Sequence, residues 1–156
     1  MKTEQLREEI AIELHAIELT IAELMALRYD VADGEPRVRD TTAAAAFLAQ
    51  FYNGIENILK RICVYHAVPL PAGETWHVEL FQLFCEPADT PLPSLFDESL
   101  AVDLAAFRRF RHVVFHSYGY QLDWTRMTEG IADVESVFSR FSDRLSDYLR
   151  SLPSQG

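Results

Sequence analysis

The residues best suited to chemistry lie in one short stretch, residues 111–118. It brings together a permanent cation, an imidazole and a phenol as Arg111, His116 and Tyr118, in the spacing Arg-x4-His-x-Tyr. Residues 107–122 hold three arginines and two histidines without one Asp or Glu, although the whole chain carries a net charge of −10. A cationic, imidazole-bearing patch on an acidic chain indicates a site for a phosphate.

These three side chains match the needs of RNA cleavage by 2′-hydroxyl attack. The reaction requires a base for the attacking hydroxyl, an acid for the leaving 5′-oxygen and cations for the charge on the phosphorane. An imidazole exchanges protons near neutral pH, so His116 can serve as base or acid. Arg111 presents a fork of N–H donors that fits a phosphate, and Tyr118 can orient the phosphate through a hydrogen bond.

A single regular helix does not place all three groups on one side. Positions five apart differ by roughly 140°, which separates Arg111 from His116, whereas Arg111 and Tyr118, seven apart, agree within about 20°. Either the helix loosens before His116, or a second copy of the chain supplies the missing group. Two-fold pairing would bring two histidines and two arginines around one phosphate, which favours a dimer.

Composition narrows the class of protein. At 156 residues, of which 49% are hydrophobic, the chain is expected to form one globular domain over residues 1–156. Its charge argues against general coating of nucleic acids, so any such chemistry must be local or depend on a second chain. No signal peptide or membrane-spanning run is recognised, and Cys63 and Cys85 stand apart. We therefore expect a cytoplasmic chain with reduced thiols, no membrane partner and, since no ligand spacing occurs, no metal or other cofactor.

Hydrophobic periodicity predicts helices along the chain. Apolar residues recur every three or four positions from Leu6 to Leu24, and the turn-forming residues 33–36 end this first helix. A second helix is expected to begin near residues 40–42, Asp-Thr-Thr, which are good N-cap residues, and to continue to Tyr65.

The second half is predicted to hold three more helices. A short helix is expected over residues 75–85, and a long one should begin at Ser94 or Asp97 and end at Gly119. A last helix should cover residues 125–149 after a cap at Asp123. No segment alternates with period two for long enough to form a strand. The chain is therefore predicted to be all-α, a bundle of four long helices and one short one.

Three segments, in order, resemble the HEPN superfamily and within it the HepT-like ribonuclease toxins. Residues 51–59 (FYNGIENIL) resemble the second-helix segment of the family, and residues 76–80 (WHVEL) its short-helix segment. Residues 110–124 resemble its active-site segment, where the motif continues as Tyr-Gly-Tyr-x-Leu-Asp-Trp.

The resemblance implies a HEPN-like bundle that forms a homodimer, in which two motifs meet and cleave RNA without a metal. It also implies a cognate nucleotidyltransferase antitoxin that transfers AMP to the motif tyrosine, Tyr118. On this basis we expect the toxin of a toxin–antitoxin pair, with Arg111 and His116 as catalytic residues. The alternative is a non-catalytic HEPN module that binds a nucleotide or a nucleotidyltransferase, a reading that the charge of −10 keeps open.

The motif residues also have structural interpretations. Arg111 falls on an apolar line of its helix, where an unpaired cation would be costly, so it is either a functional cation or the buried partner of a carboxylate. Glu56 is the candidate partner, because it lies in another of the matched segments. His116 could instead be a satisfied polar group near a helix end, where the helix dipole favours a cation.

Residues beside the motif receive secondary roles. His112 lies about 40° from His116 around the helix and is either a second contributor or a surface histidine. Arg108 and Arg109 are interpreted first as solvated charges, with contact to the RNA backbone as a supporting role.

Three aromatic residues are interpreted as structural. Tyr120 is expected to pack at the helix end. Trp76 and His77 are interpreted as a core tryptophan and a hydrogen-bonded histidine, because no second metal ligand stands three or four residues away.

Overall fold

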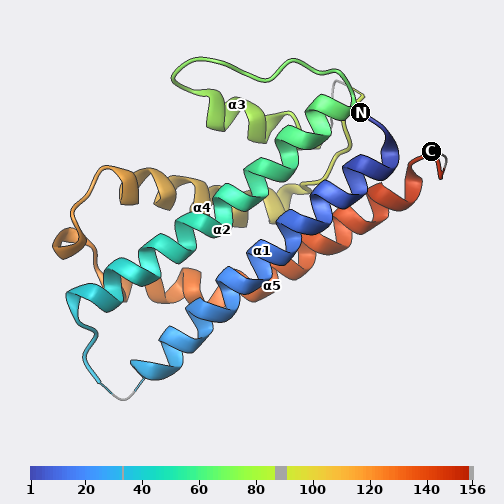
Figure 1. Cartoon of the computed structure of the whole chain (residues 1–156). Helices are drawn as coiled ribbons and strands as arrows, with labels where there is room; N and C mark the ends of the chain where they lie inside the picture. Colours follow the sequence, from blue (N-terminus) through green and yellow to red (C-terminus); the bar gives the residue numbers. More distant parts are fainter. Residues whose placement is uncertain (33, 87–90, 155–156) are drawn as a thin grey trace.

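The computed structural model describes residues 1–32, 34–86 and 91–154, and helices dominate it (Figure 1). The four long helices are α1 (Thr3–Asp30), α2 (Val38–Tyr65), α4 (Glu98–Phe115) and α5 (Trp124–Ser151). The short helix is α3 (Trp76–Gln82), and a 3-10 helix, η1 (Gly119–Gln121), joins α4 to α5. The prediction of an all-α bundle of four long helices and one short one is therefore confirmed. Extended pairing within the described residues is limited to an isolated bridge between Cys85 and Phe96.

Helix α2 is the centre of the bundle. It contacts α1, α3, α4, α5 and η1, and it runs antiparallel to α1 across the middle of the molecule (Figure 1). Small residues at its start, Ala44 and Ala45, are fully buried and let neighbouring helices approach closely. Because α2 is covered on most sides, a polar side chain in its middle must find its partners inside the protein.

One hydrophobic core draws on all five α-helices. The spacing of apolar residues in α5 shows why: a single face of that helix is buried, formed by Met127, Ile131, Val134, Val137, Phe141, Leu145 and Tyr148. Full burial of such a side chain stabilises the fold by about 1.5–3 kcal/mol. Among the helices of the described residues, none is both long and apolar enough to cross a membrane.

The starts of α4 and α5 agree with the sequence prediction, whereas the start of α2 does not. Asp123 accepts a hydrogen bond from the Thr125 N–H (3.0 Å), so the predicted cap is confirmed. Asp97, one of the two predicted starts of α4, is its N-cap and accepts a hydrogen bond from the Leu100 N–H (2.8 Å). The predicted N-cap near Asp40 is wrong, because α2 begins at Val38 after Arg37. The Asp40 carboxylate instead accepts the Arg37 N–H (2.9 Å) from the third helical position, and this bond lowers the pKa of Asp40.

Helix α4 ends at Phe115 and not, as predicted, at Gly119. His116 is the C-cap, and the N–H groups of His116 and Ser117 bond to carbonyls three residues back, which tightens the chain out of the α-helix. Position 119 requires glycine for a different reason, the close approach of η1 to α2. A Cβ at Gly119 would lie 2.2 Å from Oγ1 of Thr42, so the missing side chain lets η1 approach the start of α2.

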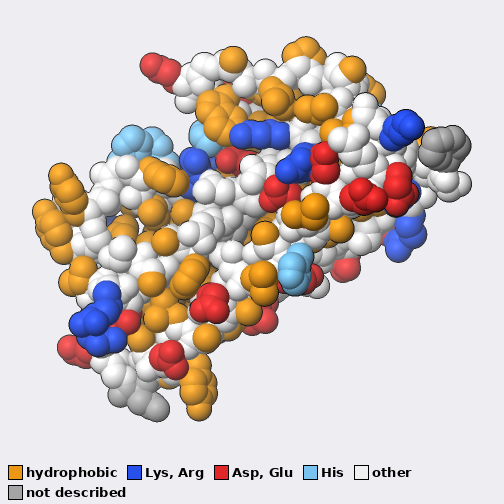
Figure 2. Space-filling model, viewed as in Figure 1, with side chains coloured by type: hydrophobic (Ala, Val, Ile, Leu, Met, Phe, Trp, Pro, Cys, Tyr) orange, Lys and Arg blue, Asp and Glu red, His pale blue; other side chains and the backbone are white. Residues whose placement is uncertain are grey.

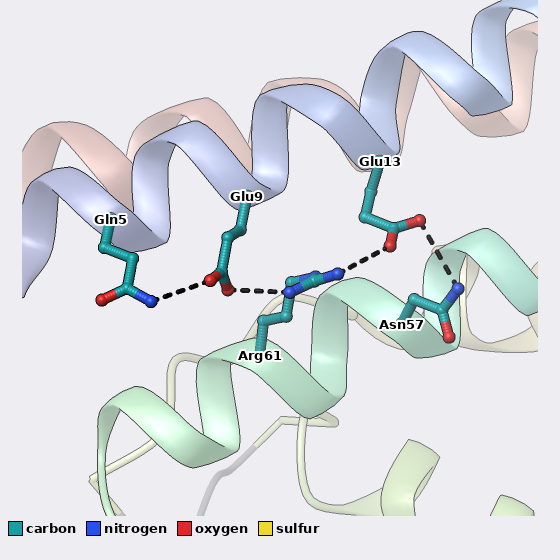
Figure 3. A network of polar contacts seen from close by, with 5 residues as sticks. All are labelled: Gln5, Glu9, Glu13, Asn57 and Arg61. Atoms are coloured by element: carbon teal, nitrogen blue, oxygen red, sulfur yellow. Dashed lines mark hydrogen bonds and ion pairs between the residues drawn. The ribbon is translucent and has the colours of Figure 1, made fainter. Parts of the chain in front are cut away.

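Polar contacts also fix α1 against α2 (Figure 3). Arg61 of α2 donates to Glu9 (2.7 Å) and to Glu13 (3.1 Å) of α1. Gln5 donates to Glu9 (3.0 Å), and Asn57 donates to Glu13 (3.4 Å), so both carboxylates have two partners. The charge of Arg61 is thereby balanced within the fold.

The two cysteines are free thiols, as expected from the sequence. Cys63 is buried in α2, and this burial raises the pKa of its thiol to about 11. Cys85 is half-buried, and burial raises its pKa as well. Both thiols therefore resist ionisation and fit a structural role.

We expect two helical glycines to respond oppositely to alanine. A Cβ at Gly54 would lie 2.5 Å from Cγ1 and 2.8 Å from Cδ1 of Ile17, across the α1–α2 interface. Gly54→Ala should therefore lower the free energy of unfolding by about 1–3 kcal/mol. Gly130→Ala meets nothing closer than a Phe107 ring carbon at 3.7 Å and should raise it by up to about 1 kcal/mol. Urea denaturation measures both changes.

Removing the clashing atoms provides the control. In an Ile17→Ala background, Gly54→Ala should be neutral or stabilising, because Cγ1 and Cδ1 are gone. An equal loss of stability in both backgrounds would contradict the steric explanation.

Candidate functional site

Arg111 is held in place by groups from several elements. Its Nε donates to Oδ1 of Asn53 in α2, and its Nη1 lies 3.3 Å from Nε2 of His77 in α3. The guanidinium carbon also lies 4.6 Å from the centre of the Phe115 ring, one turn further along α4. Among the described residues Nη2 has no hydrogen-bond partner, so the outer edge of the fork is left to bind a ligand.

The contact with Arg111 defines the protonation of His77. A guanidinium has only donors, so a hydrogen bond at this contact uses Nε2 of His77 as the acceptor and leaves Nδ1 as the ring donor. The Nδ1 proton points at Oε2 of Glu56, 2.5 Å away. The Glu56 carboxylate, His77 and Arg111 therefore form a directed chain of hydrogen bonds, in which each partner orients the next.

Glu56 is only 2% exposed in the middle of α2. The sequence suggested it as the direct partner of Arg111, but the structure connects the two residues through His77. The reason is the position of α3, which packs on α2 and brings His77 between the carboxylate and the guanidinium. The hypothesis is thus corrected from an ion pair to a relay of three side chains.

His116 and His112 form an exposed pair at the end of α4. Their ring centres lie 4.3 Å apart, and both side chains face solvent. Although the helix does end before His116, no hydrogen bond or ring contact among the described residues joins His116 to Arg111. One copy of the chain therefore presents the cation and the imidazoles as separate groups.

Tyr118 stands beyond the helix, at the entrance to η1. It is 72% exposed, and its backbone N–H donates to Oε1 of Gln121 (2.7 Å). Its ring lies nearly parallel to that of Tyr120, with centres 5.9 Å apart. The expectation that Tyr120 packs at the helix end is wrong, because Tyr120 is also 72% exposed. Both phenols are accessible to another molecule.

The neighbouring cations differ in their surroundings. Arg109 is exposed, as expected. Arg108 is half-buried, and its guanidinium lies 4.8 Å from the centre of the Phe81 ring, so the interpretation of Arg108 as a solvated charge is wrong. Its position over an aromatic ring keeps the charge on the same side of the molecule as α3.

Trp76 and His77 stack on one another with ring centres 3.6 Å apart. The prediction of a hydrogen-bonded histidine is confirmed. The prediction of a core tryptophan is wrong, because Trp76 is half-buried and Lys60 lies 4.4 Å from its ring centre.

Sequence reasoning missed Asn53 and His77 as members of the site. Both lie in segments that carry the family resemblance, residues 51–59 and 76–80, and that coincidence was the available signal. Within the described part of the chain, no group of three His, Cys, Asp or Glu residues is placed to hold a metal ion.

The family model described as HepT-like protein matches residues 43–152, which run from the first turns of α2 to the end of α5. This chain belongs to the HepT-like family. The match contains every residue of the site described above and confirms the resemblance recognised in the sequence. No curated protein and no solved structure matches the chain.

We expect His77 to be neutral with its proton on Nδ1 at neutral pH, because Arg111 can only donate to Nε2. Long-range ¹H–¹⁵N NMR of the imidazole distinguishes the two neutral tautomers and the cation. Glu56→Gln should weaken the preference for the Nδ1–H form, since a carboxylate is the stronger acceptor. A cationic ring, or a proton on Nε2, in the wild-type protein would contradict the relay.

Proposed function

We propose that this HepT-like protein is a metal-independent endoribonuclease and the toxin of a toxin–antitoxin pair. The observation that carries the proposal is the prearranged Arg111, whose Nη2 edge stays available while Asn53 and His77 hold the rest of the fork. A cation oriented before the substrate arrives stabilises transition-state charge without a reorganisation cost.

The proposed reaction uses imidazoles to move protons. The 2′-hydroxyl attacks the adjacent phosphorus while one imidazole takes its proton, and the bond from phosphorus to the 5′-oxygen breaks as another imidazole protonates the leaving oxygen. The products are a 2′,3′-cyclic phosphate and a 5′-hydroxyl. His116 is the principal imidazole, and His112, whose ring centre is 4.3 Å from that of His116, is the supporting one. Arg111 binds the charged phosphorane oxygens, and Arg108 adds to the positive electrostatic potential around them.

A homodimer would complete this site. Arg111 and His116 are not hydrogen-bonded to each other within one copy, and two-fold pairing would bring a second imidazole pair toward each arginine. The exposed side of α4 supports this pairing, because Val102 and Val113 are 63% and 48% exposed. Eleven positions are about three turns, so both valines lie on one face of α4, with the exposed Arg109 between them.

Control by a cognate nucleotidyltransferase is proposed to act at Tyr118. Its 72% exposure makes the phenol accessible to an enzyme that transfers AMP. The phosphodiester formed would add about one negative charge close to the end of α4. That phosphate would compete for the Arg111 fork, and the adenosine would block approach to His116.

A non-catalytic module that binds a nucleotide is the second candidate. The absence of a hydrogen bond or ring contact between Arg111 and His116 among the described residues of one copy favours it. Induced expression of the wild type and of His116→Ala discriminates the two candidates. Growth arrest that disappears with this single change supports the nuclease, and identical growth of both strains supports the binding module.

Arg111→Ala and His116→Ala should each lower RNA cleavage by about a hundredfold or more, since both groups act on charge in the transition state. Arg111→Lys should fail as well, because an ammonium does not reproduce the two-pronged contact. Arg126→Ala removes an exposed arginine of α5 and serves as the matched control with near wild-type cleavage. Cleavage of a labelled RNA is measured together with helical content and oligomeric state. Unfolded Arg111 and His116 variants would indicate a structural role instead.

Cleavage should persist in EDTA, because the proposed proton transfers and charge stabilisation use side chains alone. The assay compares rates with EDTA, and with EDTA followed by excess Mg²⁺ or Mn²⁺. A rate that collapses in EDTA and returns with either ion would overturn the metal-independent mechanism.

Incubation with the cognate nucleotidyltransferase and ATP should add mass in steps of AMP and remove nuclease activity. Tyr118→Phe should block both effects and keep much of the cleavage, because its hydroxyl is assigned only a positioning role. Tyr120→Phe, which changes the equally exposed neighbouring ring, is the matched control and should still be modified. AMP mapped to Tyr120, or to no tyrosine, would refute the assignment.

A further inference from the structure

A small hollow lies against Trp76, the residue whose ring stacks on His77. It has a volume of about 240 Å³ and is lined by Lys60, Leu70, Pro71, Trp76 and Leu80. Its walls are an aromatic ring, aliphatic side chains and one cation. This composition suits a flat, apolar ring that carries a negative group at its edge.

The two faces of the Trp76 ring are covered differently. The His77 ring fills one face, with its centre 3.6 Å away, and His77 is fixed by Glu56 and Arg111. Since that face is occupied, Lys60, with its Nζ 4.4 Å from the ring centre, must cover the other. The Lys60 side chain has a flexible stem of four carbons, so its ammonium can move away from the Trp76 ring without disturbing the fold.

Lys60 forms no ion pair with a carboxylate among the described residues, and its ammonium lies over the Trp76 ring. The next residue, Arg61, is bound by both Glu9 and Glu13 (Figure 3). The two cations therefore have different roles. Arg61 is neutralised to join α1 and α2, whereas the charge of Lys60 remains available to a ligand.

The hollow lies near the proposed phosphate site but is not part of it, because neither His77 nor Arg111 lines it. Trp76 contacts His77, and His77 lies 3.3 Å from Arg111, so one imidazole separates the exposed ring from the proposed phosphate-binding fork. Figure 2 shows His and Lys/Arg side chains following one another across the upper part of one face. Glu56 is 2% exposed and does not oppose an anion there, whereas Glu74 and Glu79, which flank Trp76 in the chain, are exposed.

We propose that Trp76 and Lys60 form a stacking subsite for a nucleotide of single-stranded RNA next to the phosphate bound by Arg111. The base displaces Lys60 from the ring and stacks on Trp76, and the released ammonium binds the neighbouring backbone phosphate. The inference rests on the proposed function for the identity of its ligand. It makes Trp76 and Lys60 determinants of substrate binding and not of the proton transfers.

Intrinsic fluorescence tests the stacking directly, because the chain has two tryptophans and Trp124→Phe leaves Trp76 as the single reporter. His116→Ala in the same chain prevents cleavage during titration. A single-stranded oligouridylate should quench the remaining emission, and a duplex RNA of equal length should not. Absence of quenching by the single strand at concentrations that bind would overturn the proposal.

Substitutions then separate stacking from folding. In the His116→Ala background with a labelled oligouridylate, Trp76→Leu should weaken binding about tenfold or more, whereas Trp76→Phe, which keeps an aromatic face, should retain most of the affinity. Lys60→Gln should reduce the slope of log affinity against log salt by about 0.7, the loss of one phosphate contact. Arg126→Gln, an exposed arginine of α5, is the matched control with unchanged affinity and slope.

The outcomes distinguish this inference from the proposed function. RNA binding with quenching, but no cleavage by the wild type, would remove the nuclease and leave the subsite standing. Cleavage by the wild type, with equal affinity for Trp76→Leu and Trp76→Phe, would keep the nuclease and remove the subsite.

Discussion

The polar site depends on a carboxylate buried in the central helix. Glu56 is 2% exposed in α2, and such a group is tolerated only if its charge is paired and hydrogen-bonded. His77 provides the N–H, and this contact leaves Nε2 as an acceptor for Arg111. Leaving a buried acceptor without its hydrogen-bond donor costs about 1–3 kcal/mol, and more for a charged group, so stability and site geometry are connected in this bundle. The guanidinium is oriented because the core requires the carboxylate to be satisfied.

The distribution of cation partners explains how a chain of net charge −10 can offer an anion site. Several arginines away from the site are paired with carboxylates, such as Arg61 with Glu9 and Arg140 with Asp103. The cations near α3 lie instead over aromatic rings, and these are Lys60 over Trp76, Arg108 over Phe81 and Arg111 over Phe115. A ring stabilises a cation without cancelling its charge, so the positive potential remains local.

The site has two parts with different mechanical properties. Arg111 is fixed by α2 and α3, whereas His116 and Tyr118 follow the end of α4 and are exposed. This division fits a cycle in which a prearranged cation binds phosphate and accessible groups exchange protons or accept a modification. It also gives the proposed dimer a role, because no hydrogen bond or ring contact among the described residues joins His116 to Arg111 within one copy.

The sequence by itself determined the helices, because apolar spacing sets which face each helix must bury. It also indicated a cap at Asp123 and a helix start at Ser94 or Asp97, because capping acts within three residues. It also identified Arg111, His116 and Tyr118 as one motif and the chain as HepT-like. It did not determine where α4 ends or why Gly119 is needed, since that depends on Thr42 at the start of α2. Nor did it reveal the relay. Glu56, His77 and Arg111 lie on three different helices, and only packing places the His77 side chain of α3 between the other two side chains. Local patterns specify helices, whereas hydrogen bonds between distant residues exist only after the core has brought them together.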